Sequence, residues 1–99
     1  MGGVDFTTSR LAAASLNLSE ATQLFGVPIG RKYIQRVAVL QAVEKFAHLY
    51  GHRALRLHPL RGDRTGQYAI TLTGNYRLII ERTSEETVRI LSVEDYHGD

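Results

Sequence analysis

The chain has no cysteine, which excludes disulfide bridges and metal sites built on thiolates. A zinc ion would have to be held by histidine and carboxylate ligands alone. The absence also fits a reducing compartment, so we expect a cytoplasmic protein. No apolar run approaches the ~18 residues that a membrane-spanning helix needs, and the N-terminus lacks the pattern of a secretory signal.

The chain has little net charge for a nucleic-acid-binding protein, with a formal value of +2, and its 99 residues predict one domain over residues 1–99. The basic residues are unevenly distributed, however. Between Gly51 and Gly66, Asp63 is the only acid against Arg53, Arg56, Arg61 and Arg64. Such a local basic patch is what phosphate binding requires, although a solvated surface can show the same pattern.

The N-terminal half has the pattern of a short strand followed by helices. We expect a loose end at residues 1–3 and a strand at residues 4–6. Hydroxyl residues at 7–9 can cap a helix, and apolar residues recur at helical spacing up to Ala21. Asn17 and Ser19 indicate that this helix is split, while Gly26 and Pro28 mark its end and the start of the next helix.

The second helix is predicted by an apolar stripe, and we expect it to cover the sheet. The stripe consists of Tyr33, Val37, Leu40, Val43 and Ala47, with a second basic cluster off it at Arg31, Lys32 and Arg36. Gly51 ends the pattern at the latest. An earlier stop near Val43, with a connector over residues 44–51, is equally compatible with the sequence.

The C-terminal half has the pattern of a small sheet. Residues 54–57 predict a short strand that enters His58 and Pro59, at an edge or turn because proline has no backbone donor. Alternation with a period of two predicts three further strands, over residues 68–72, 76–81 and 88–93. The whole is an α+β fold in which N-terminal helices pack on one face of a mainly antiparallel sheet, and the other face is partly open.

The polar residues around these strands are those that metal-independent RNA cleavage needs. The reaction uses the ribose 2′-hydroxyl as nucleophile and requires a base, an acid and fixed positive charge at the phosphate. Histidine can serve as acid or base, arginine fits phosphate oxygens, and tyrosine can stack on a base. The candidates are His58, Arg61, Arg77, Asp95, Tyr96 and His97. Each can equally be structural, and the sequence does not show that they meet.

A metal site is the other reading of the histidines. His48 and His52 have the spacing that places two imidazoles on one helix face, with Glu44 as a third ligand. Gly51 is expected to break the helix between them, which favours two solvent-facing histidines. We therefore expect no metal and no cofactor.

An ordered set of motifs resembles the HigB branch of the RelE/ParE toxins. The set comprises Leu57-His58-Pro59-Leu60-Arg61-Gly62-Asp63-Arg64-Thr65-Gly66, then Tyr68 and Ile70, then Asn75-Tyr76-Arg77, and finally Asp95-Tyr96-His97. It covers roughly the last two-fifths of the chain. The resemblance implies catalytic roles for His58, Arg77, Asp95, Tyr96 and His97, and phosphate binding by Arg61. Thr73-Gly74 stands where relatives often have an arginine, and Arg64 is a possible replacement.

The resemblance also implies a function and partners. Such toxins cut messenger RNA in the ribosomal A site and are neutralised by a cognate HigA-type antitoxin with a helix-turn-helix domain, through which they reach operator DNA indirectly. Two alternatives remain open. One is a non-enzymatic ParE-like toxin that inhibits a protein target such as gyrase, and the other is an inactive interaction module.

Overall fold

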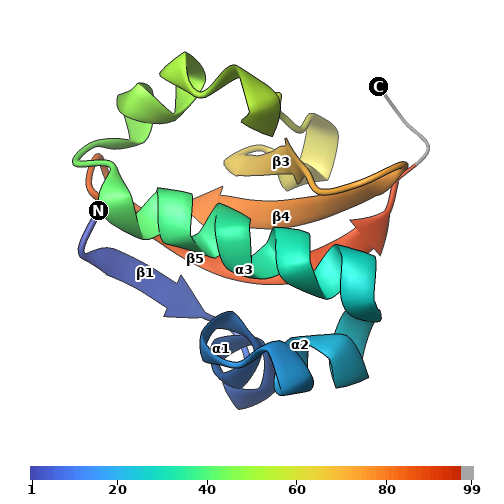
Figure 1. Ribbon diagram of the computed structural model, residues 1–99. Helices are drawn as coiled ribbons and strands as arrows, with labels where there is room; N and C mark the ends of the chain where they lie inside the picture. The colour runs from blue at the N-terminus through green and yellow to red at the C-terminus, as the bar shows by residue number, and fades with distance from the viewer. Residues whose placement is uncertain (97–99) are drawn as a thin grey trace.

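The computed structural model describes residues 1–96, which contain one five-stranded sheet of order β1-β5-β4-β3-β2 (Figure 1). The strands are β1 (Gly3–Phe6), β2 (His58–Pro59), β3 (Gln67–Thr71), β4 (Tyr76–Arg82) and β5 (Thr87–Asp95). β1 runs parallel to β5, and all other neighbours are antiparallel. The expected mainly antiparallel sheet is confirmed, and β5 extends two residues further than its alternation predicted, to include Glu94 and Asp95.

One predicted strand is wrong. Residues 54–57 do not pair; the short helix η2 (Arg53–Leu55) takes their place, and strand pairing begins only at His58. The reason is the left-handed conformation of Arg56, whose φ is 48°, which ends η2 and interrupts extended backbone before β2. Leu55 is buried in the main core at this turn. Its apolar character therefore reflects this one buried position and not the alternating pattern of a strand.

The first helical region is split as expected, into α1 (Ser9–Leu16) and α2 (Leu18–Phe25). Thr8 caps α1 by accepting a hydrogen bond from the Leu11 amide. Asn17 ends α1 and caps α2 through the Glu20 amide, which explains why the periodicity continues across the break. The two short helices are followed by Gly26, whose φ of 82° turns the chain into the next helix.

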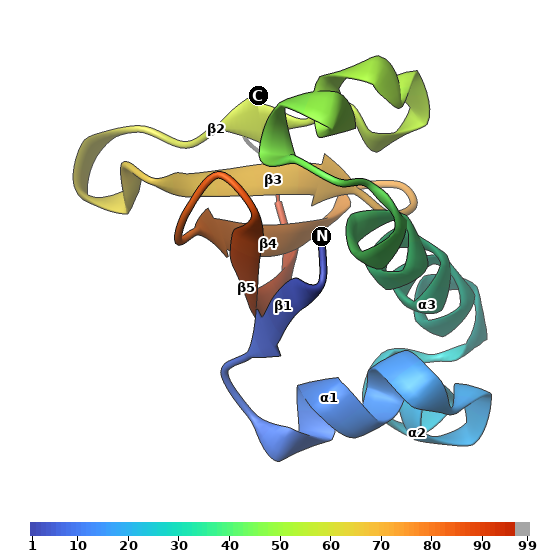
Figure 2. The same cartoon turned by 90° about the vertical axis from the view of Figure 1, so that its left-hand side faces the viewer.

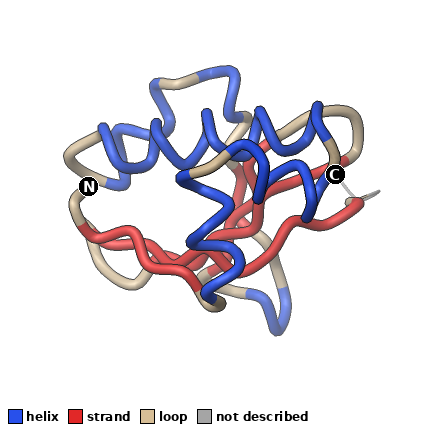
Figure 3. Tube along the Cα trace, turned by 60° about the horizontal axis from the view of Figure 1, so that its bottom comes forward, coloured by secondary structure: helices blue, strands red, loops and turns tan. Residues whose placement is uncertain are grey.

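The long helix α3 (Val27–Ala42) covers one face of the sheet, as the apolar stripe predicted. Figure 2 shows α3 beside the sheet with α1 and α2 at one end of it. The buried core between α3 and the sheet is formed by Tyr33, Val37, Leu40, Ile70, Leu72, Leu78 and Ile80. Most helical segments gather on this side of the strands (Figure 3). No helix within residues 1–96 has the length and apolar character needed to cross a membrane.

The extension of this helix to Ala47 is wrong, and the earlier stop is correct. Val43 leaves the helix with a ψ of 150°, and the separate short helix η1 (Phe46–Gly51) follows. The Phe46 amide donates to the Glu85 carbonyl at 2.9 Å, so the chain leaves α3 to bind the turn between β4 and β5. Phe46 is itself buried, which accounts for the apolar residues beyond the helix end.

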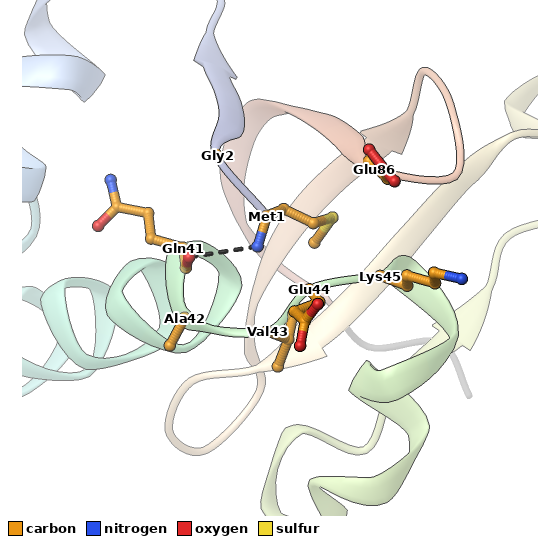
Figure 4. Close-up of a pocket in the computed structure, with 8 residues that line it drawn as sticks. All are labelled: Met1, Gly2, Gln41, Ala42, Val43, Glu44, Lys45 and Glu86. Atoms are coloured by element: carbon orange, nitrogen blue, oxygen red, sulfur yellow. Dashed lines mark hydrogen bonds between the residues drawn. The ribbon is translucent and has the colours of Figure 1, made fainter.

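The N-terminal residue is not a loose end. Met1 is 3% exposed, and its ammonium group donates to the carbonyls of Leu40 and Gln41 at the last turn of α3, at 3.4 and 3.2 Å. A positive charge is favourable there because the carbonyl end of a helix is partially negative. Figure 4 shows the bond to Gln41 in a pocket of about 330 Å³, which is lined by none of the residues expected to act in RNA cleavage.

Candidate functional site

The sheet face opposite α3 carries His58 in a row of paired residues. His58 on β2 lies opposite Ala69 on β3, Ala69 lies opposite Ile79 on β4, and Ile79 lies opposite Ser92 on β5. Because paired residues in neighbouring strands share a face, these four side chains form one row across the sheet. Leu60, Ala69 and Ile79 form a small second core there, against which Leu91 and Tyr96 pack.

His58 is half-buried at the start of this row. Its Nδ1 lies 3.5 Å from the carbonyl oxygen of Arg56, and its Nε2 is buried without a hydrogen-bond partner among residues 1–96. A buried polar nitrogen without a partner is uncommon and calls for an explanation. The left-handed turn at Arg56 is what places the imidazole here, since it directs the chain into β2 immediately before His58.

Tyr96 meets His58 from the other end of the chain. The two ring centroids are 6.1 Å apart, and the Tyr96 amide donates to the Asn75 carbonyl at 2.8 Å, which ties the end of β5 to the β3–β4 hairpin. A pocket of about 280 Å³ opens beside the pair. It is lined by Pro59, Leu60, Arg61, Arg64 and Tyr96. The structure therefore places the His58 ring against the ring of Tyr96, and Tyr96 shares the pocket lining with Arg61.

Arg64 is bound to Glu94, a carboxylate outside the set of predicted site residues. Its Nη1 and Nη2 donate to both oxygens of Glu94, at 3.1 and 2.8 Å, and its Nε donates to Gln67 at 3.0 Å. These bonds hold the pKa of the Glu94 carboxyl below its ordinary value, so this group is ionised at neutral pH. Glu94 was detectable in the sequence as an acid that alternates onto the open face of β5 among arginines.

Arg77 and Asp95 lie near the hairpin end of the sheet. Arg77 is opposite Thr71 on β3 and Glu94 on β5, and its Nη1 donates to the carbonyls of Gly74 and Tyr76 at 2.8 and 3.0 Å. Asp95 is opposite Tyr76 and is exposed at the end of β5. The predicted His97 lies outside the described residues, so its place relative to His58 stays a prediction.

The remaining basic candidates lie around η2. Arg53 and Arg56 are exposed there. Arg36 of α3, a member of the second basic cluster, connects this region to the sheet. Its Nε donates to the Thr71 carbonyl at 2.9 Å and its Nη2 to the Ala54 carbonyl at 3.5 Å. Arg36 therefore links α3, β3 and η2.

The helical pair of histidines does not form. His48 lies in η1 and accepts a hydrogen bond from the Lys45 amide through Nδ1 at 3.4 Å, while His52 follows the end of that short helix. Glu44 precedes η1 and does not share a helix with them. Within residues 1–96, no three histidine, aspartate or glutamate side chains are grouped so that they can hold a metal ion.

No model of a known protein family matches the chain. A stretch of 60 residues is 35% identical to a protein named Endoribonuclease HigB from Proteus vulgaris, and this stretch is 59% of the present chain and 64% of that protein. The aligned part thus spans a little less than two thirds of the curated relative's length.

Two solved structures share the fold across nearly the whole chain. The YoeB/ParE toxin from Agrobacterium tumefaciens has a TM-score of 0.59 and 15% identity, covering 97% of this chain and 99% of that one. YoeB from Staphylococcus aureus, whose structure is that of a dimer, has a TM-score of 0.55 and 16% identity, covering 97% of both chains. At these identities the likeness is one of fold.

Proposed function

We infer that the chain is a HigB-type member of the RelE/ParE toxin superfamily, because part of it matches HigB and its fold is that of the YoeB/ParE toxins. From this premise we propose that it is a toxin that cleaves messenger RNA on the ribosome. A cognate antitoxin is the partner that this proposal requires. The carrying observation is the convergence of His58 and Tyr96 beside a pocket that Arg61 lines.

His58 is the proposed acid–base group among the described residues. An imidazole titrates near neutral pH and can take the proton of the 2′-hydroxyl or give one to the leaving 5′ oxygen. Its Nε2 has no hydrogen-bond partner among residues 1–96, so this nitrogen is the one that we propose exchanges the proton. Asp95 and His97 are the further acid–base candidates, and the order of base and acid among the three is not assigned.

The charged and aromatic residues have separate proposed roles. Arg61, at the pocket wall, and Arg77, at the hairpin, would bind phosphate oxygens and balance the charge that develops during cleavage. Tyr96 would stack on or orient the nucleotide. The ribosome would supply much of the remaining alignment, because positioning of the messenger lowers the barrier without any further catalytic group.

We expect His58→Ala to abolish most of the cleavage while the fold is retained. General acid–base groups contribute roughly a hundredfold to ten-thousandfold to such reactions, so the rate should fall by at least about a hundredfold. The measurement is cleavage of a defined messenger in a purified translation system, mapped by primer extension, with and without ribosomes. His52→Ala is the matched control, because His52 is an exposed histidine away from the pocket.

Two results would contradict this proposal. Cleavage that survives in His58→Ala at the wild-type rate would remove His58 from the mechanism. A folded wild-type protein that makes no cuts under either condition would refute the nuclease function itself. Growth arrest by such a protein, unchanged by His58→Ala and Asp95→Ala, would instead support a ParE-like toxin acting on a protein target.

A further inference from the structure

Glu94 has two arginines within reach, and it binds the one that is distant in sequence. Arg77 lies directly opposite Glu94 in the β4–β5 register, a position in which opposite charges ordinarily pair. The Glu94 carboxylate nevertheless accepts both of its arginine hydrogen bonds from Arg64, 30 residues away. Within residues 1–96, Arg77 and Glu94 form no ion pair with each other.

Both ends of the Arg64–Glu94 pair are held by further contacts. Arg64 Nε donates to the Gln67 side chain, at 3.0 Å, and Ser92 Oγ donates to Glu94 at 2.9 Å. The two charged side chains are 35% and 34% exposed, so they form a partly shielded pair with two-point geometry. A side chain fixed by three hydrogen bonds is poorly suited to reorient toward a phosphate.

Arg77 has the opposite character. Its guanidinium donates to the carbonyls of its own hairpin, at Gly74 and Tyr76, which orients the group without neutralising its charge. A carboxylate bound to Arg77 would occupy its donors and repel a nearby phosphate. The identity of Glu94's partner therefore decides how much positive charge this end of the sheet presents.

We propose that Arg64 is a positioning residue that holds the Glu94 carboxylate away from Arg77, so that Arg77 keeps its charge for an RNA phosphate. This inference rests on the proposed function, and it gives Arg64 a role other than the phosphate binding that the sequence suggested. Removal of Arg64 releases Glu94, which then pairs with the arginine opposite it.

The cleavage assay tests this through a rescue. Arg64→Ala should raise KM and lower kcat/KM by roughly ten- to a hundredfold, the size expected when a charge-assisted contact is lost. Adding Glu94→Gln to that variant should restore most of the loss, since the released carboxylate is then gone. Arg89→Ala is the matched control, because it frees Glu81, which pairs with Arg89 on the same face and not with Arg77; it should cleave like the wild type.

A failure of Glu94→Gln to restore the activity of Arg64→Ala would overturn the proposal. A gain of activity in Glu94→Gln alone would also overturn it, because it would mean that Glu94 prevents Arg64 from binding the phosphate. A second measurement does not depend on activity. Double-mutant cycles between Arg77→Ala and Glu94→Gln, read by thermal unfolding, should show no coupling in the wild type and favourable coupling in Arg64→Ala. Coupling in the wild type, or its absence in Arg64→Ala, would refute the inference even if the protein were no nuclease.

Discussion

Tyr33 joins two helices through a single buried hydroxyl. The side chain is fully buried on α3, and its hydroxyl donates to the Leu11 carbonyl of α1 at 2.6 Å. Burial raises the pKa of this phenol well above its ordinary 10.0, because the charged form would lose its hydration. Because the pKa is raised in the folded state, the neutral phenol contributes its full share to the free energy of unfolding below pH 10. This contribution is lost as the pH rises above 10.

Tyr33→Phe should therefore change both stability and its pH dependence. We expect a loss of about 0.5–1.5 kcal/mol in the free energy of unfolding near neutral pH, from the missing hydrogen bond. Above pH 10, the stability of the variant should fall less steeply than that of the wild type. Denaturant unfolding at a series of pH values measures both, with the exposed Tyr76→Phe as control. Equal alkaline slopes in wild type and variant would contradict the assignment.

Arg56 is the one residue other than glycine with a positive φ in the described chain, at 48°. A left-handed conformation costs a residue with a side chain roughly 1–2 kcal/mol. Arg56→Gly relieves this strain and Arg56→Ala retains it, while both remove the guanidinium. We expect the glycine variant to be more stable than the alanine variant by about 1 kcal/mol, in thermal or denaturant unfolding. An alanine variant of equal stability would show that the turn is not strained.

For single residues, the types of the site residues were more predictable from the sequence than the partners of their hydrogen bonds. The residue types and order around His58, Arg61, Arg77 and Tyr96 suggested one site. In the structure, Arg61 and Tyr96 line one pocket and His58 contacts the Tyr96 ring. The partner of Glu94 was not predictable, because Arg64 reaches it from a turn whose path over the sheet depends on tertiary packing. Strand register favours pairing of Glu94 with Arg77 opposite it, yet these two side chains form no ion pair among residues 1–96.

Among the elements, α2 and α3 make an unusually close contact at Gly30. A β-carbon built at this position would lie 3.0 Å from the carbonyl carbon of Ala21 and 3.1 Å from its oxygen. In an open helix, Gly→Ala stabilises by roughly 1 kcal/mol, but here backbone would have to move. We expect Gly30→Ala to destabilise by about 1–3 kcal/mol, as overpacking does.

Gly51→Ala is the control for this prediction. Gly51 lies at the end of η1, where an added β-carbon meets nothing within 4 Å. Its free energy of unfolding should stay within about 0.5 kcal/mol of the wild type, as for most surface substitutions. A Gly30→Ala protein that is more stable than the wild type would mean that the two helices can separate without cost.

Helices and strands were predictable where a periodic pattern of apolar residues marked one buried face. The stripe on α3 and the alternation on β3 and β4 gave these elements, since each buries a single face against the other. The end of α3 was ambiguous because Ala47 continues the helical spacing of the stripe. In the structure Ala47 is exposed, and Phe46 and Leu49 of the separate short helix η1 are buried instead. The failed strand at residues 54–57 was an apolar pattern that a left-handed turn overrides.

In the whole molecule, the two faces of the sheet differ in what covers them. One face is buried under α3 and carries most of the core. The other keeps a small core of Leu60, Ala69 and Ile79 beneath the polar residues. The order of strands was not predictable, because the parallel pairing of β1 with β5 joins segments that share no local signal. This parallel pairing places β5, which carries Glu94 and Asp95 and leads directly to Tyr96, inside the sheet between β1 and β4.

That placement has a consequence for when the molecule becomes active. The Thr7 hydroxyl donates to the carbonyl of Ile90 across 83 positions of the chain, so the pairing that adds β1 to the sheet is very distant in sequence. Contacts of this kind form late and slow the folding of a domain. Because synthesis proceeds from the N-terminus, β1, the helices, β2, β3 and β4 all emerge before the strand that unites them. Under the proposed function, a nascent or prematurely ended toxin that lacks β5 would have neither the strand that joins β1 to β4 nor Tyr96 at the site. The ribosome that makes it would therefore not be cut until that strand is in place.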